Sequence, residues 1–131
     1  MIKAVIFDLD GTLLNTLEDL CDSVNFALLK QNYPPRTIEE IRQFVGNGVN
    51  KLIERALPAK TEPKNFQICL EDFKSKYTEI MLNKTKPYDG IIEMLTELKL
   101  SGIKTAILSN KFDAATKKLC NYYFALHKDF L

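Results

Sequence analysis

Apolar residues recur along this chain with two different periods, and each period predicts one kind of element. Runs of apolar and β-branched residues at about 2–8 and 103–108 predict two strands. Elsewhere, apolar residues recur every three or four positions, which is the spacing of one helix face. This spacing predicts helices at about residues 16–31, 37–46, 49–57, 66–81, 91–100 and 113–123.

The order of these elements predicts an α/β fold. One strand is followed by four helices and then by helix, strand and helix, so we expect a doubly wound parallel sheet with an inserted helical part. The expected core comprises residues 1–14 and 86–131, and the four-helix insertion comprises residues 15–85. The core is incomplete, because two strands are too few for an independently stable sheet.

Capping residues predict where three of the helices begin. Asn15, with Glu18 three positions later, is expected to cap the first helix. Thr37 and Glu40 have the spacing of a capping box, which predicts the start of the second helix. Asp113 is expected to cap the last helix.

Composition restricts the class of protein. The 131 residues include 18 Lys and Arg against 17 Asp and Glu, so the net charge of +1 gives no electrostatic reason to bind nucleic acid or an anionic membrane. The cysteines at 21, 69 and 120 lie far apart and show no metal-binding spacing, which favours a cytoplasmic protein whose thiols fill the core. No apolar run is long enough for the core of a signal peptide or for a membrane span.

Two acidic residues follow the first strand directly. Asp8 and Asp10 come after four apolar residues, so the strand reads as buried. Because successive side chains in a strand point to opposite faces, both carboxylates should lie close together on one face. Like charges held close need a cation, a proton or hydrogen-bond donors, and Mg2+ prefers carboxylate oxygens. This strand end is therefore a plausible phosphoryl-transfer site.

The acidic pair has two other possible roles. Asp10-Gly11 could be a solvated turn, although it continues directly into apolar residues. The segment could also be a calcium-binding EF-hand loop. That loop requires glycine where Leu13 stands, and a helix rather than a strand in front of it.

The same residues carry a family resemblance. Residues 7–13, Phe-Asp-Leu-Asp-Gly-Thr-Leu, resemble the first signature of the haloacid-dehalogenase superfamily of phosphatases. Residues 107–111, Ile-Leu-Ser-Asn-Lys, are similar to its second signature, an apolar strand that ends in Ser or Thr. Residues 44–49 and 52–57 resemble the helical cap of phosphoglycolate phosphatases. Independently, ligands bind at the carboxyl ends of parallel strands, which brings both signatures to one edge.

The resemblance implies a Mg2+-dependent phosphomonoester hydrolase, similar to phosphoglycolate phosphatases, that works through an aspartyl-phosphate intermediate. Asp8 would attack phosphorus and bind the metal. Asp10 would protonate the leaving alkoxide, take a proton from water and contact Mg2+ through its backbone carbonyl. The family's dehalogenases lack this second acid, so Asp10 argues against dehalogenase chemistry. The expected partner is a small phosphorylated metabolite.

Further contacts with phosphate are expected from the second signature. Ser109 would donate its hydroxyl to a phosphoryl oxygen, together with backbone N–H groups near Asn110. Alternatively, Ser109 only caps a turn. Lys111 does not stand where the family has its phosphate-neutralising lysine, so we expect it to be a surface charge that at most reaches the substrate.

The loop Gly46-Asn47-Gly48 has two readings. Glycines explain it fully as a turn that ends a helix. By resemblance, the loop belongs to the cap and contacts the non-phosphate end of the substrate.

The family's third and fourth signatures, a lysine and an acidic loop, are not found in this sequence. The alternative function is therefore a catalytically incomplete chain that acts at most as a weak metal- and phosphate-binding module. We expect the 131-residue chain alone to be poorly active, and its incomplete sheet to allow self-association.

Overall fold

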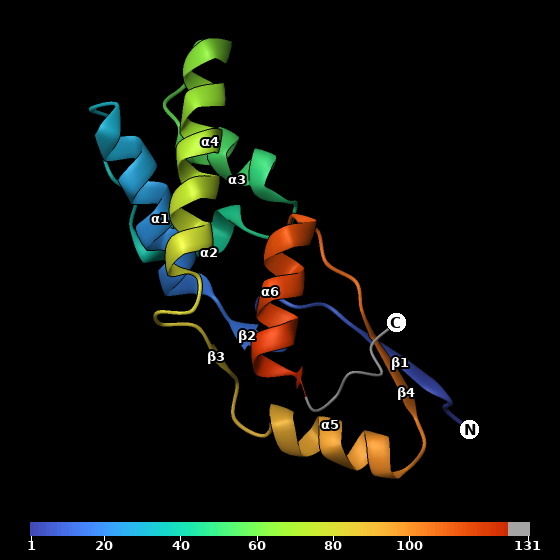
Figure 1. Ribbon diagram of the computed structural model, residues 1–131. Coiled ribbons are helices and arrows are strands. Elements are labelled where there is room, and N and C mark those ends of the chain that lie inside the picture. The colour runs from blue at the N-terminus through green and yellow to red at the C-terminus, as the bar shows by residue number, and fades with distance from the viewer. Residues whose placement is uncertain (126–131) are drawn as a thin grey trace. The chain divides into compact units, whose positions relative to one another are not determined.

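A computed structural model describes residues 1–125, and the end of the expected core, residues 126–131, lies outside the described residues. Residues 1–15 and 86 onward form one compact unit, and Thr16–Thr85 form a second. In chain order the elements are β1 (Ala4–Phe7), β2 (Leu14–Asn15), α1 (Leu17–Lys30), α2 (Ile38–Phe44), α3 (Val49–Ala56), α4 (Pro63–Ile80), β3 (Lys86–Pro87), α5 (Ile91–Leu100), β4 (Lys104–Ile107) and α6 (Asp113–Tyr123) (Figure 1).

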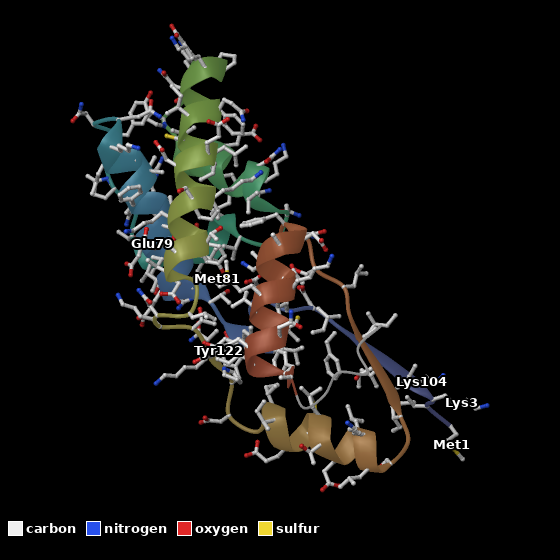
Figure 2. The ribbon with its side chains drawn as sticks, in the orientation of Figure 1. Met1, Lys3, Glu79, Met81, Lys104 and Tyr122 are labelled. Carbon is white, nitrogen blue, oxygen red and sulfur yellow. The ribbon has the colours of Figure 1, made fainter. Side chains whose placement is uncertain are left out.

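The first unit is built on the parallel pair β1 and β4. Their register runs from Ala4 beside Lys104 to Phe7 beside Ile107. At the start of the pair, the N–H of Lys104 donates to the carbonyl of Lys3 at 3.1 Å, and Figure 2 labels these two residues next to each other. The parallel α/β core and the four-helix segment that the sequence predicts are thus confirmed.

The prediction that β1 is buried is wrong. Ala4 is exposed, Ile6 is 68% exposed, and Val5 and Phe7 are only half-buried. Leu108, just after β4, is 74% exposed. A parallel strand becomes buried when both faces of its sheet are covered. Among the described residues, β1 has β4 as its single partner strand, so its apolar side chains stay accessible.

A short antiparallel pair lies where the chain leaves the first unit and returns to it. In this pair, Leu14 lies beside Pro87 and Asn15 beside Lys86. No residue pattern indicates this pair, since two-residue strands show no period and proline is rare within strands.

The capping predictions had different outcomes. Thr37 and Glu40 form the predicted capping box, with both reciprocal hydrogen bonds present. Asn15 does not cap α1, because it is held in β2, and Thr16 takes the cap position although its side chain makes no capping hydrogen bond to the helix. Asp113 is the first helical residue of α6, after Phe112, and so does not cap it either.

The second unit consists of α1 to α4. Helices α1 and α4 pack along each other (Figure 1). Each buried aliphatic or aromatic side chain contributes about 1.5–3 kcal/mol to folding. Phe73 and Tyr77 of α4 are fully buried and stack with ring centroids 5.6 Å apart. Cys21 and Cys69 are also buried, which agrees with a packing role for these thiols. None of the described helices has both the length and the apolarity that a membrane crossing requires.

A buried carboxylate ties the start of this unit to its end. Asp19, in the first turn of α1, is 0% exposed. Its Oδ2 accepts the backbone N–H groups of Lys84 and Thr85 at 2.9 Å each, and the Thr85 hydroxyl at 2.8 Å. Buried donors must be paired, and hydrogen bonds to a charged acceptor are the strong ones. Asp19 therefore fixes the segment at which the helical unit ends.

This clamp gives a stability prediction. Asp19→Ala removes the acceptor of the buried N–H and hydroxyl of Thr85 and of the partly buried N–H of Lys84, so we expect it to lower the free energy of unfolding by about 3 kcal/mol. Asp22→Ala is the matched control, because it removes only the half-exposed ion pair with Lys84 at 2.8 Å and should cost about 0–1 kcal/mol. Urea unfolding of both variants measures the difference. Equal effects would contradict the clamp.

Candidate active site

The two loops that follow β1 and β4 lie at the same edge of the sheet. The ladder continues past Ile107, because the N–H of Leu108 donates to the carbonyl of Phe7 at 2.8 Å. Asp8 therefore leaves β1 where Leu108 and Ser109 leave β4. The parallel register places both sequence signatures at one edge, as expected from the rule for open α/β sheets.

A tight turn after β1 sets the directions of the acidic side chains. The carbonyl of Leu9 accepts three backbone N–H groups, from residues 12, 13 and 14, at 3.0–3.2 Å. Gly11 has a φ of +76°, a conformation that glycine adopts without strain. Strand geometry ends at Phe7 rather than persisting to Asp10, yet exposure still alternates, since Asp8 is exposed, Leu9 is buried and Asp10 is half-buried.

The strongest contact of the site joins the two loops. The Lys111 Nζ atom lies 3.0 Å from Asp10 Oδ1, and the Lys111 side chain is only 3% exposed. The expectation that Lys111 is a surface charge is therefore wrong. A buried ammonium requires a charged or strongly polar partner, and the Asp10 carboxylate provides one.

Burial and the Asp10 charge together shift the pKa values of two groups at this site. Burial lowers the pKa of the Lys111 amino group below its ordinary value, while the Asp10 carboxylate opposes the shift. On α6, burial raises the pKa of the Cys120 thiol, and the Asp10 charge raises it further. The carboxylate of Asp10 thus acts on groups from two neighbouring segments.

Ser109 holds the turn that carries Lys111. Its Oγ accepts the backbone N–H of Lys111 at 3.1 Å, so the turn role considered as an alternative is present. A serine hydroxyl has one proton to donate and two acceptor positions, and this bond uses an acceptor position. Donation from Ser109 to a phosphoryl oxygen stays a prediction, as does the contact expected near Asn110.

The loop Gly46-Asn47-Gly48 lies between α2 and α3 in the second unit. Gly46 has a φ of +118° and Gly48 a φ of +86°, and Gly48 is the residue that precedes α3. Backbone conformation alone accounts for both glycines. Substrate contact by this loop remains a prediction from the resemblance.

The oxygen atoms available at Asp8 are compatible with a magnesium ion that has few protein ligands. Among residues 1–125, no group of three or more His, Cys, Asp or Glu side chains is close enough to form a metal cage. Mg2+ does not require such a cage, since it commonly binds one or two carboxylates and keeps several waters. Asp8 is exposed, so its carboxylate is accessible to a metal ion, whereas the Asp10 carboxylate is paired with Lys111. The contact of the Asp10 backbone carbonyl with Mg2+ stays a prediction from the resemblance.

Sequence reasoning missed the part that Lys111 plays. The signal was available, because Lys111 follows β4 at the edge where Asp10 follows β1. Lys111 was expected at the surface because it does not stand where the family has its phosphate-neutralising lysine, and that expectation took no account of its place beside Asp10.

The turn after β1 gives a prediction about Gly11. An added Cβ at this position meets no atom within 4 Å, so Gly11→Ala changes only backbone strain. We expect a loss of about 1–2 kcal/mol in the free energy of unfolding, measured in urea. Gly11→Asn should cost less, because asparagine tolerates positive φ. An unchanged stability in Gly11→Ala would contradict the described turn.

Comparison with known proteins finds phosphoglycolate phosphatases among the relatives of this chain. A phosphoglycolate phosphatase of Thiobacillus denitrificans is 34% identical over 122 residues, which cover 90% of this chain and 54% of that protein. One of Agrobacterium fabrum is 38% identical over 109 residues, covering 81% and 47%. A crystal structure of a predicted phosphoglycolate phosphatase from Haemophilus somnus is 29% identical, with a TM-score of 0.92, and the match covers 98% of this chain and 60% of that one.

The chain spans about half the length of the curated relatives it matches. The family model for haloacid dehalogenase-like hydrolases matches residues 5–128, nearly the whole chain. This chain belongs to the family of haloacid dehalogenase-like hydrolases.

Proposed function

We propose that this chain carries the nucleophile of a Mg2+-dependent phosphomonoesterase that forms an aspartyl-phosphate. The main support is that the loops bearing Asp8 and Ser109 meet at one sheet edge and are joined by the ion pair of Lys111 with Asp10. The phosphoglycolate phosphatases among its relatives favour 2-phosphoglycolate, or a similar small phosphorylated metabolite, as the substrate. A cytoplasmic location agrees with its three free cysteines.

Asp8 is the group best suited to attack phosphorus. Its side chain is exposed at the sheet edge, and its Oδ1 accepts the N–H of Leu9 at 2.8 Å, which orients the carboxylate. In the first step, an oxygen of Asp8 bonds to phosphorus while the bond from phosphorus to the ester oxygen breaks. Asp10 gives a proton to the leaving alkoxide.

The second step returns Asp8 to its starting form. Asp10 takes a proton from a water molecule, whose oxygen bonds to phosphorus. The bond between phosphorus and the Asp8 oxygen breaks, which releases inorganic phosphate. The Ser109 hydroxyl would donate to a phosphoryl oxygen in both steps. Mg2+, held by the Asp8 carboxylate and the Asp10 backbone carbonyl, would shield the negative charge of the phosphoryl group.

The runner-up is a chain that binds metal and phosphate weakly without turnover. One observation favours it: among the described residues β1 pairs with β4 alone and is largely exposed. Substrate charge would then meet fewer stabilising groups than catalysis needs.

An assay of Asp8 separates the two functions. With Mg2+ and either 2-phosphoglycolate or an aryl phosphate, we expect Asp8→Asn to abolish turnover, because an amide does not replace the carboxylate as nucleophile. Ser109→Ala should lower kcat/KM about ten- to a hundredfold, the effect of one hydrogen bond to a charged oxygen. Asp113→Asn removes an exposed carboxylate on α6 and serves as the control. Turnover that survives Asp8→Asn would contradict the proposed nucleophile, and phosphate binding without turnover would favour the runner-up.

Self-association is a further part of the proposal. Ile6 and Leu108 expose apolar surface on a sheet that has only two strands among residues 1–125, an arrangement that favours pairing with another chain. We expect the sedimentation coefficient to rise with concentration, and Ile6→Lys to remove this dependence by placing a charge on the strand. Concentration-independent sedimentation of the unmodified chain would contradict self-association.

A further inference from the structure

We propose that Lys111 is a positioning residue that holds the Asp10 carboxylate for proton transfer. The inference rests on the proposed function, because Asp10 acts there as the general acid and base. Nothing in the motif resemblance assigns this part to Lys111. It follows from the contact between the loops that leave β1 and β4.

The geometry of the pair favours positioning. Lys111 Nζ contacts Oδ1 of Asp10 at 3.0 Å, one oxygen of the carboxylate. The Asp10 side chain is 24% exposed and Lys111 is 3% exposed, so the cation lies on the inner side of the pair and the acid on the more open side. Lys111 therefore holds the Asp10 carboxylate from its buried side, while the carboxylate stays accessible at the sheet edge.

The backbone around Lys111 is itself held in place. The N–H of Lys111 donates to Ser109 Oγ at 3.1 Å, inside the turn that follows β4. The pairing of Leu108 with Phe7 places this turn beside the start of the Asp8–Asp10 segment. Because the backbone on both sides of the ion pair is held by the paired strands, the Lys111 ammonium can restrict Asp10 to one rotamer. A solvated lysine samples many conformations and does not restrict its partner in this way.

Rotamer restriction matters because proton transfer depends on position. A displacement of a catalytic group by about 1 Å can cost a hundredfold in rate. We therefore expect Lys111→Met, which keeps the length and the burial of the side chain, to release Asp10 among several rotamers. Lys111→Arg keeps a cation near Asp10 and should restore most of the restriction.

The first measurement needs no activity. Three-bond couplings to the Asp10 side-chain carbon report the distribution of its χ1 angle in the labelled 131-residue chain. We expect one dominant rotamer in the unmodified chain and in Lys111→Arg, and averaged couplings in Lys111→Met. Lys117→Met is the matched control, because it removes an exposed lysine of α6 whose partner is Asp113. Unchanged couplings in Lys111→Met would overturn the proposal, provided that its amide spectrum shows a folded chain.

The second measurement assigns the consequence to catalysis. With an aryl phosphate, Lys111→Met should lower kcat about ten- to a hundredfold and change KM less than about twofold, with recovery in Lys111→Arg. A raised KM, or weaker inhibition by inorganic phosphate at unchanged kcat, would make Lys111 a phosphate-binding residue and overturn the proposal. If the unmodified chain shows no turnover, the proposed function fails, and the couplings alone decide whether Lys111 positions Asp10.

Discussion

The parallel pairing of β1 with β4 is the constraint on which the rest of the site depends. Phe7 lies beside Ile107, so the chain leaves both strands at the same edge. A slip of one residue would turn every side chain of one strand to the other face. The register therefore fixes which side of the sheet receives Asp8 and which loop reaches Asp10. The ion pair with Lys111 is possible because segments a hundred positions apart in the sequence are held in this register.

The chain passes from one unit to the other twice, and within each unit the two crossing segments are joined by hydrogen bonds. Asn15 pairs with Lys86 in the first unit, and Asp19 binds the backbone of Thr85 in the second. The two ends of the helical unit are thereby held together, which offsets part of the entropy of closing so long a loop.

The sequence predicted most of the fold and the place of the site. Long helices such as α1 and α4 have apolar residues at helical spacing over several turns. The strands β1 and β4 are each followed by candidate site residues. The predictions that proved wrong concern residues whose burial or pairing depends on tertiary contacts. Lys111 is buried and pairs with Asp10 from the loop after β1. Asn15 pairs with Lys86 instead of capping α1. Ile6 is exposed although the residues around it are apolar. Residue type and the spacing of apolar residues do not predict these two pairings or this exposure.

The most direct test of the central claim is to find the phosphorus on Asp8. The chain is mixed with Mg2+ and a reactive phosphate donor such as acetyl phosphate, quenched in acid, digested and examined by mass spectrometry. The account predicts one phosphoryl group on the peptide that contains Asp8, removable by hydroxylamine as an acyl phosphate is, and absent from Asp8→Asn. Phosphate on another side chain, or hydrolysis of the donor with Asp8 unmodified throughout, would contradict it.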